Sequence, residues 1–332
     1  HGSATWSRAA AVAPRRARLV VMALAMSAAP AATNLVVLAA IMLAIGLAEG
    51  TLDVGVNTLV VWKFRDRSGP YLNAVHFFFA VGAFVSPMVV ARAIAATGDI
   101  SWAYWVLALY LVPVAVWLWA VPSPAPSIRS DADAPERVIG RSGPLLALIV
   151  TFYFVYIGAE ASYGGWIYSY AYEMRLEDET GAAYLTSVFW GALAAGRLVT
   201  IPVAARVRPR FILVATLAAA ITSIAVVLAV PGSVWAVRAG SAGAGFAMAA
   251  IFPTMLALAG RHVRITGKVN SLIFAGASAG SIAFPWLIGQ LLEPFGIRSV
   301  MVVILACAVA AMGVLGVVLA VISARERAGR RT

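Results

Sequence analysis

The stretch NLVVLAAIMLAIGLAEGTLDVGVNTLVVW, residues 34–62, is apolar over a length that crosses a bilayer, yet it contains Glu49, Asp53 and Asn57. These three residues recur every four positions, so on a helix they lie along one face. A carboxylate at membrane depth costs roughly 2.5–3.5 kcal/mol on insertion scales, and intramembrane acids usually face a bundle interior and mark a substrate or proton path. The stretch therefore predicts a membrane helix whose polar face serves transport.

The composition of the whole chain indicates a membrane protein. Of the 332 residues, 62% are hydrophobic and 12% are charged, and the charged share is roughly half that of a soluble domain. The apolar runs extend over about twenty residues without a period of two, which favours helices over barrel strands. The predicted fold class is therefore an all-α, polytopic transmembrane helical bundle.

The net charge of +11 does not indicate a nucleic-acid partner. The basic residues form short clusters between apolar runs, as expected where cytoplasmic loops are rich in Lys and Arg. The single cysteine, Cys307, lies in an apolar run and excludes an internal disulfide. The sequence has no metal-ligand cluster, no nucleophile beside a base and no phosphate-binding loop. We therefore expect no enzyme activity, no cofactor and no metal.

The apolar runs predict ten membrane spans, four before a polar segment and six after it. They cover residues 19–32, 34–62, 71–96, 102–121, 144–170, 182–204, 209–230, 233–259, 266–292 and 297–322. The polar segment PSPAPSIRSDADAPERVIGRSG is rich in Pro, Ser and charge, which is typical of a linker. The predicted domains are residues 1–121, the cytoplasmic linker 122–143, and the six-helix bundle 144–332.

The distribution of basic residues predicts the topology. If the N-terminal loop is cytoplasmic and the spans alternate, most of the 25 Lys and Arg fall on the cytoplasmic side. The opposite side holds Arg175 and Arg298, as the positive-inside rule requires. We expect an integral multi-pass protein of a bacterial inner membrane with both chain ends cytoplasmic.

Six spans after a basic linker resemble half of a major facilitator, a superfamily built from two six-helix halves. Four spans before the linker then imply that the first two helices are missing. The run GALAAGRL, continued by RVRPR at 206–210, resembles the superfamily's gating loop motif. The gating residues that this resemblance implies are Gly191, Gly196, Arg197 and Arg206. The run GASAG at 276–280 resembles the small-residue eleventh helix.

Two stretches resemble narrower families. GLAEGTLDVGVN at 46–57, followed by PYLNAVHFFFAVGAF at 70–84, resembles the sodium-dependent glucose transporter 1 family and, more distantly, fucose permease-type sugar:proton symporters. Those symporters carry a helix 4 acid implicated in proton coupling and sugar binding, and this resemblance assigns that role to Asp53. YIGAEASYGGWIYSY at 156–170 is similar to helix 7 of the glucose transporter family. A second acid, in helix 1 of the symporters, has no counterpart here.

The position of Asp53 supports its assignment as the coupling acid. It lies nine residues before Trp62, about 13 Å along a helix, close to the midplane of a ~30 Å core. The alternative is a structural acid paired with a basic group. Glu49, one turn away, is either a second ligand or a packing acid, while the flanking Gly46 and Gly50 predict close helix contact.

Further polar residues extend the candidate site. Asn57 and His76 lie at matching depth on neighbouring predicted helices, where they can bond to each other or to Asn73. His76 is either a proton relay or a fixed polar contact. Glu160 lies about 24 Å along its helix, and the following Gly164-Gly165 pair is typical of a broken, substrate-binding helix. Remaining candidates are Tyr163 and Trp166, which would stack on a sugar or gate its path, and Asn270.

Three charged features outside these candidates receive structural interpretations. Arg197 is expected to make a gating salt bridge or a helix-end contact, and Arg238 to reach the membrane surface. The acidic run from Glu173 to Glu179 is expected to form a solvated loop.

The sequence thus predicts a monomeric transporter in the lipid bilayer, which takes up a hexose-type sugar by alternating access, coupled to protons or sodium. The alternatives are a proton-linked exporter of drugs or other small molecules, and a non-transporting truncated homologue.

Overall fold

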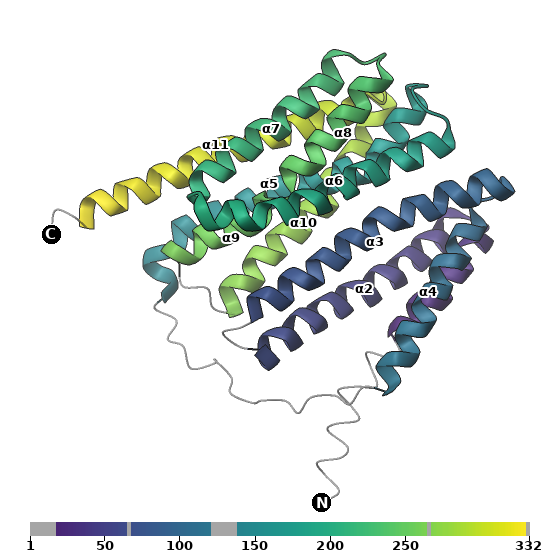
Figure 1. The fold of residues 1–332 in the computed structure, drawn as a ribbon, viewed down its shortest axis with the longest axis horizontal. Coiled ribbons are helices and arrows are strands. Elements are labelled where there is room, and N and C mark those ends of the chain that lie inside the picture. Colours follow the sequence, from purple (N-terminus) through teal and green to yellow (C-terminus); the bar gives the residue numbers. More distant parts are fainter. Residues whose placement is uncertain (1–17, 65–67, 121–137, 264–266, 330–332) are drawn as a thin grey trace, which may run out of the picture. The chain divides into compact units, whose positions relative to one another are not determined.

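The computed structural model describes residues 18–64, 68–120, 138–263 and 267–329, and these residues are almost entirely helical (Figure 1). Within them, eight helices are long and apolar enough to cross a membrane. Two shorter apolar helices, Arg18–Ala31 and Ser101–Trp117, complete a set that corresponds one for one to the predicted spans. The protein is a polytopic α-helical bundle, as the sequence predicts.

The described elements are all helices. They are η1 (Ala29–Ala31), α2 (Leu35–Phe64), α3 (Ser68–Thr97), α4 (Ser101–Ala120), α5 (Val138–Glu173), α6 (Glu179–Arg206), α7 (Pro209–Ala229), α8 (Val234–Met248), α9 (Ile251–His262), α10 (Gly267–Phe295) and α11 (Ser299–Gly329). The helix α5 starts six residues before the predicted span, although its apolar part starts at Gly143. Most of the predicted linker 122–143, namely residues 122–137, lies outside the described residues.

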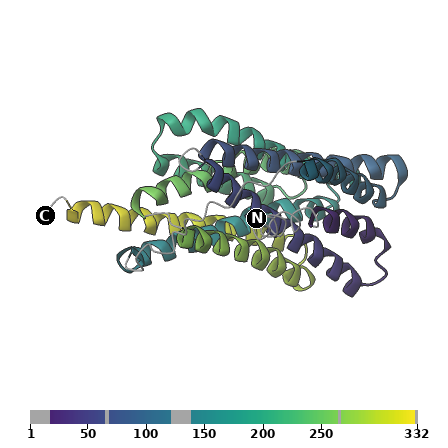
Figure 2. The same ribbon diagram turned by 90° about the horizontal axis from the view of Figure 1, so that it is seen from below.

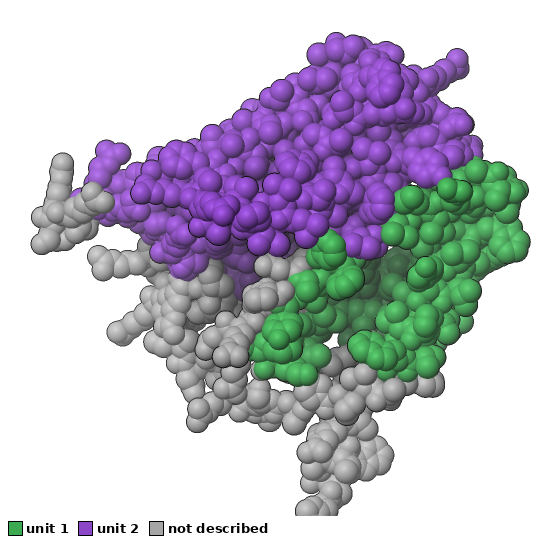
Figure 3. Space-filling view, viewed as in Figure 1, with its two compact units in different colours: residues 1–79, 85–130 green, residues 80–84, 131–332 purple. Residues whose placement is uncertain are grey.

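The chain divides into two compact units (Figure 3). The N-terminal unit comprises residues 1–79 and 85–130, and the C-terminal unit comprises residues 80–84 and 131–332.

In the N-terminal unit, the first described helix contacts both α2 and α4 through η1. The Trp105 indole N–H of α4 donates to the Ser27 carbonyl over 3.3 Å. Few side chains of α2 are buried: in its most apolar window, Leu35–Asp53, the buried share is 6%. The helix α2 therefore depends little on packing against the described part of its own unit.

The turn from α3 to α4 is specified by its sequence. Gly98 has a φ of +70°, which favours glycine, and its N–H bonds to the Ile94 carbonyl over 2.8 Å. Asp99 Oδ1 then accepts hydrogen bonds from the Ser101 N–H at 2.9 Å and the Ser101 hydroxyl at 2.7 Å. These two bonds, the backbone one first, hold the pKa of Asp99 below its usual range.

The C-terminal unit has an extensive core. Helix α5 packs against α6, α10 and α11, and α8 packs against α6 and α7. The largest fully buried side chains include four tyrosines of α5, namely Tyr153, Tyr156, Tyr163 and Tyr170. Helix α11, yellow in Figure 2, carries the C-terminus. Since α5 contacts three other helices and carries four of the largest buried side chains, it is a central element of the unit.

Glycines allow the helices of the C-terminal unit to approach closely. A Cβ atom at Gly280 of α10 would lie 1.9 Å from the Phe154 carbonyl oxygen of α5, and one at Gly245 would lie 2.1 Å from the Phe189 carbonyl oxygen. This is the small-residue packing of membrane helices. In the N-terminal unit, by contrast, no described atom lies within 4 Å of a Cβ at Gly46 or Gly50. The prediction of close contact at those two glycines is wrong for the described residues.

The helix break lies elsewhere than the glycine pair predicts. Helix α5 is continuous through Gly164 and Gly165, and a Cβ at Gly164 would meet the Trp190 indole at 2.5 Å. The break occurs instead in the predicted span 233–259, between α8 and α9. Ala249 and Ala250 keep right-handed helical dihedrals, so the break is an interruption of the helical hydrogen bonding, and Pro253 contributes to it because it has no N–H for the Ala249 carbonyl.

Candidate functional site

The two acids of α2 lie on an exposed part of the helix surface. Glu49 and Asp53 are one turn apart, and both are exposed. Between them, the Thr51 hydroxyl is satisfied by the Leu47 carbonyl at 2.8 Å. The structure therefore presents the two carboxylates together at the middle of an apolar helix. Asn57, Asn73 and His76 lie on α2 and α3, but their side chains are outside the described part of the structure.

A second polar group lies inside the C-terminal unit. Tyr156 and Glu160 are one turn apart on α5, and the Tyr156 hydroxyl is hydrogen-bonded to the Glu160 carboxyl. The same hydroxyl lies 2.7 Å from the Met248 carbonyl oxygen at the end of α8. Tyr156 is 1% exposed, whereas Glu160 is partly exposed. Tyr156 thus connects an acid of α5 to the backbone at the helix break.

Arg197 of α6 faces the same group. It lies well inside α6, and its charge acts on both Glu160 and Tyr156. We call Glu160, Tyr156, Arg197 and the Met248 carbonyl the α5–α8 cluster. Arg197 lies inside α6 rather than at its end, whereas one alternative suggested by the sequence is a contact at the helix end.

Tyrosine hydroxyls satisfy the backbone on both sides of the break. The Tyr153 hydroxyl donates to the Phe252 carbonyl over 2.8 Å, and the Tyr153 ring packs edge-on against the Phe252 ring. Two tyrosines spaced by three residues on α5 supply hydroxyls to the two sides of the break.

The aromatic candidates of α5 are packed within the C-terminal unit. Tyr163 is fully buried, stacks on Phe189 at 4.8 Å between ring centroids, and bonds to the Ser241 hydroxyl at 3.0 Å. Because the Ser241 hydroxyl donates to the Val237 carbonyl, Tyr163 is the donor of the pair. These contacts place Tyr163 in the core. As a sugar-stacking residue it remains an untested prediction.

Two further candidates lie on or against α10. The Trp166 indole N–H donates to the Pro285 carbonyl of α10 over 3.2 Å, and the ring is partly buried. Asn270 is partly buried near the start of α10.

The predicted gating residues spread along α6. A Cβ at Gly196 would lie 2.5 Å from the Phe246 carbonyl oxygen and 2.8 Å from the Ala249 Cβ, so this glycine lets α6 approach the break. Gly191 lies further toward the start of α6, and Arg206 is its exposed last residue. The structure brings Gly196 and Arg197 to the region of the break and leaves Arg206 at the turn into α7.

The turn between α5 and α6 is more ordered than a solvated loop. Arg175 has a φ of +54°, its N–H bonds to the Tyr172 carbonyl, and the Leu176 N–H bonds to the Ala171 carbonyl. This is a Schellman motif with arginine where glycine is usual. The Asp178 side chain then caps α6 by accepting from the Gly181 N–H over 2.7 Å.

Glu177 makes an ion pair across the same turn. Arg238 Nε donates to its Oε1 at 2.6 Å and Arg238 Nη2 to its Oε2 at 3.1 Å, which ties the α5–α6 turn to α8. The prediction of a merely solvated run is wrong at Glu177, because its side chain is only 9% exposed.

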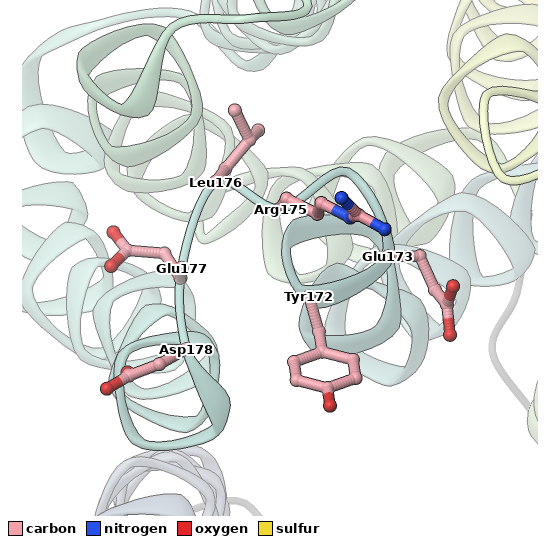
Figure 4. A pocket seen from close by; sticks show the side chains of 6 residues that line it. All are labelled: Tyr172, Glu173, Arg175, Leu176, Glu177 and Asp178. Carbon is pink, nitrogen blue, oxygen red and sulfur yellow. The ribbon is translucent and has the colours of Figure 1, made fainter.

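A hollow opens at this turn, but its polar groups do not converge (Figure 4). Figure 4 shows Glu173 on one side of the turn and Glu177 with Asp178 on the other, pointing apart. Glu177 is engaged by Arg238, and Asp178 by the α6 cap. Among the described residues, no group of three or more His, Cys, Asp or Glu could hold a metal ion. The hollow is therefore part of a structural turn.

Sequence reasoning missed Tyr156, Tyr153 and the Met248 carbonyl. The spacing of four between Tyr156 and Glu160 places both on one helix face and could have linked them. Pro253 within an apolar span was the sequence signal of the break. The partners across the helices, by contrast, depend on tertiary packing, which no local pattern specifies.

Comparison with known sequences agrees with this fold. The Major Facilitator Superfamily profile matches residues 2–285. Over 284 residues the chain is 29% identical to sodium-dependent glucose transporter 1 of Xenopus laevis, covering 77% of this chain and 58% of that protein. The human protein of the same name is 27% identical over 297 residues, covering 79% and 57%. The chain therefore spans less than two thirds of the length of these relatives.

Solved structures show the same architecture. The transporter FucP in its outward conformation is 18% identical, has a TM-score of 0.61, and is matched over 93% of this chain and 83% of its own. The nucleoside transporter NupG is 12% identical, has a TM-score of 0.70, and is matched over the same shares. At such identities the likeness shows the fold and carries no information about substrate.

The superfamily profile covers most of the chain, the helical architecture agrees, and the resemblance read from the α2 and α5 motifs is confirmed by the named relatives. The chain is an integral, multi-pass membrane protein that belongs to the Major Facilitator Superfamily.

Proposed function

We propose that this protein carries a hexose-type sugar across a membrane by alternating access, with transport coupled to sodium or protons. The observation that carries the proposal is the acid pair of α2, exposed in the middle of an apolar helix. A carboxylate there can accept hydrogen bonds from sugar hydroxyls and can bind a proton or a sodium ion. Relatives named sodium-dependent glucose transporters support the substrate class.

In this proposal Asp53 is the coupling acid and Glu49 its neighbour in the pathway. Asn57, Asn73 and His76 supply further polar groups on α2 and α3. Glu160, Trp166 and Asn270 contribute from the C-terminal unit, with Tyr163 supporting them from the core. Gly191, Gly196, Arg197 and Arg206 belong to the gating elements. The protein acts as a monomeric carrier rather than an enzyme.

The proposal also covers organisation and location. Residues 1–121 form one half bundle, 122–143 a cytoplasmic linker, and 144–332 the second bundle. The membrane in this proposal is a bacterial inner membrane, and the clustering of Lys and Arg supports both chain ends on its cytoplasmic side.

The test is counterflow of labelled glucose, galactose and fucose in proteoliposomes containing wild-type protein or Asp53→Asn. Counterflow requires no driving ion, so it separates sugar transport from coupling. Exchange in both proteins supports a sugar carrier in which Asp53 serves coupling, and exchange lost in the variant alone makes Asp53 a sugar ligand. If wild-type protein exchanges none of the three, the sugar proposal fails and export of other small molecules becomes the leading function.

A further inference from the structure

The protons available in the α5–α8 cluster are fewer than its contacts require. The Tyr156 hydroxyl has a single proton, and it lies within hydrogen-bond distance of both the Glu160 carboxyl and the Met248 carbonyl. A carbonyl oxygen and an ionised carboxylate are both acceptors only. If Glu160 were ionised, one of the two contacts would lack a proton.

A protonated Glu160 satisfies every contact. The Glu160 O–H then donates to the Tyr156 oxygen, and the Tyr156 O–H donates to the Met248 carbonyl. This arrangement leaves no acceptor unpaired around the Tyr156 hydroxyl, whose side chain is fully buried and where an unpaired polar group is costly. A neutral Glu160 therefore accounts for both contacts of that hydroxyl.

We propose that Glu160 is a proton-binding site of the C-terminal unit, and that Tyr156 transmits its state to the Met248 carbonyl at the α8–α9 break. The inference deepens the proposed function, on which it rests, by assigning a proton site to a second acid. When Glu160 loses its proton to water, the Tyr156 O–H turns to the carboxylate. The Met248 carbonyl then loses its donor, and the break is loosened. No other bond is made or broken.

The surroundings of Glu160 allow both the protonated and the ionised form of its carboxyl group. Glu160 is partly exposed, so its proton has a route to water. The described charged or titratable groups that act on it are Arg197 from α6 and Tyr156 on its own helix, with Tyr153 facing Tyr156. The charge of Arg197 favours the carboxylate once the proton has left. Tyr156 is a positioning residue, because it acts through the acid and the carbonyl.

Hydrogen exchange at the break tests the relay. Amide exchange of the segment from Met248 to Thr254 is measured by mass spectrometry on the reconstituted full chain over a pH series and corrected for intrinsic rates. Wild-type protein is expected to show a several-fold step in exchange at the pH where Glu160 titrates. Glu160→Gln retains a donor to Tyr156, so it should exchange slowly at every pH. Tyr156→Phe should exchange faster, without a step.

The matched control is Tyr153→Phe. It removes a similar tyrosine–carbonyl bond from the other side of the break, at the Phe252 carbonyl, without touching the acid. It should raise exchange at all pH values and keep the step. A step that persists in Glu160→Gln, or its absence from wild-type protein, would overturn the relay.

A second readout reports the acid itself. Infrared difference spectra between pH values should show a carboxylic C=O band in wild-type protein and Tyr156→Phe that is absent from Glu160→Gln. An identical band pattern in all three proteins would overturn the assignment of the proton to Glu160. Neither measurement uses sugar, so a failed hexose counterflow would reject the proposed function separately from this inference.

Discussion

The two units hold their membrane acids in different ways. In the N-terminal unit, Glu49 and Asp53 lie exposed on a helix whose most apolar window is 6% buried. In the C-terminal unit, Glu160 is bonded to Tyr156 and lies in a helix whose window is 50% buried. Carboxylates within apolar helices of one chain thus have different surroundings. Glu49 and Asp53 lie at the surface of their helix. Glu160 is bonded to Tyr156, whose hydrogen bonds depend on whether Glu160 is protonated.

The largest expected difference between the two units is in the loss of stability when a glycine is replaced by alanine. Gly280→Ala places a Cβ against the Phe154 backbone carbonyl, and overpacking of this kind costs about 1–3 kcal/mol. Gly50→Ala in the N-terminal unit meets no described atom within 4 Å and should be neutral or slightly stabilising, since alanine favours helices. Thermal unfolding in detergent measures both. Equal losses of stability would show that α2 is as tightly packed as α10.

The next prediction concerns the buried aromatic residue of α5. Tyr163→Phe removes a hydrogen bond to Ser241 and should cost about 1 kcal/mol in the free energy of unfolding. Hexose counterflow by this variant should match wild-type protein, because the ring remains in the core against Phe189. A large loss of exchange with stability unchanged would instead place Tyr163 in the sugar pathway.

A smaller effect is expected at the outer turn of the C-terminal unit. Glu177→Gln breaks the ion pair with Arg238, whose side chain is 47% exposed. Such exposed pairs contribute about 0.2–1 kcal/mol, and the effect should shrink at high salt. Glu173→Gln is the matched control, since it replaces an exposed carboxylate on the same turn. Unfolding at low and high salt compares the two variants. A salt-independent loss would mean that packing, rather than charge, holds the turn.

The smallest effect is expected at the turn of the N-terminal unit. Hydrogen bonds from Ser101 lower the pKa of Asp99 in the folded protein from its ordinary 3.8. The stability they contribute is therefore complete above the unfolded pKa and is lost as the pH falls through the folded one. Asp99→Asn should show a weaker decline in unfolding temperature than wild-type protein at acidic pH. Parallel declines in the two proteins would exclude this contribution.

The sequence predicted the membrane-spanning architecture well, because apolar runs and basic clusters depend only on the solvent that each segment meets. The run from Leu35 to Phe64 and the long apolar runs of α10 and α11 are examples. The sequence predicts a broken helix at Gly164-Gly165, whereas α5 is continuous there and Gly164 lies against Trp190. The interruption lies between Met248 and Ile251.

The candidate site was predictable only in part. An acidic residue within an apolar run is visible in the sequence, so Glu49, Asp53 and Glu160 could be predicted as candidate site residues. The partners of the α5 tyrosines lie on another helix: Tyr156 contacts the Met248 carbonyl, a backbone group, and Tyr163 contacts Ser241, an ordinary residue of α8. The partners become visible only when tertiary packing brings helices 78 or 92 residues apart in sequence into contact.

The most direct measurement is hexose transport by Asp53→Asn and Glu160→Gln side by side in proteoliposomes, first as counterflow and then as accumulation driven by a proton or sodium gradient. We expect counterflow in both variants. We further expect that Asp53→Asn loses gradient-driven accumulation, while the hexose exchange rate of Glu160→Gln depends less on pH than that of wild-type protein. Full accumulation by Asp53→Asn would contradict the coupling role of the α2 acid. Wild-type protein that exchanges no hexose would contradict the account at its centre.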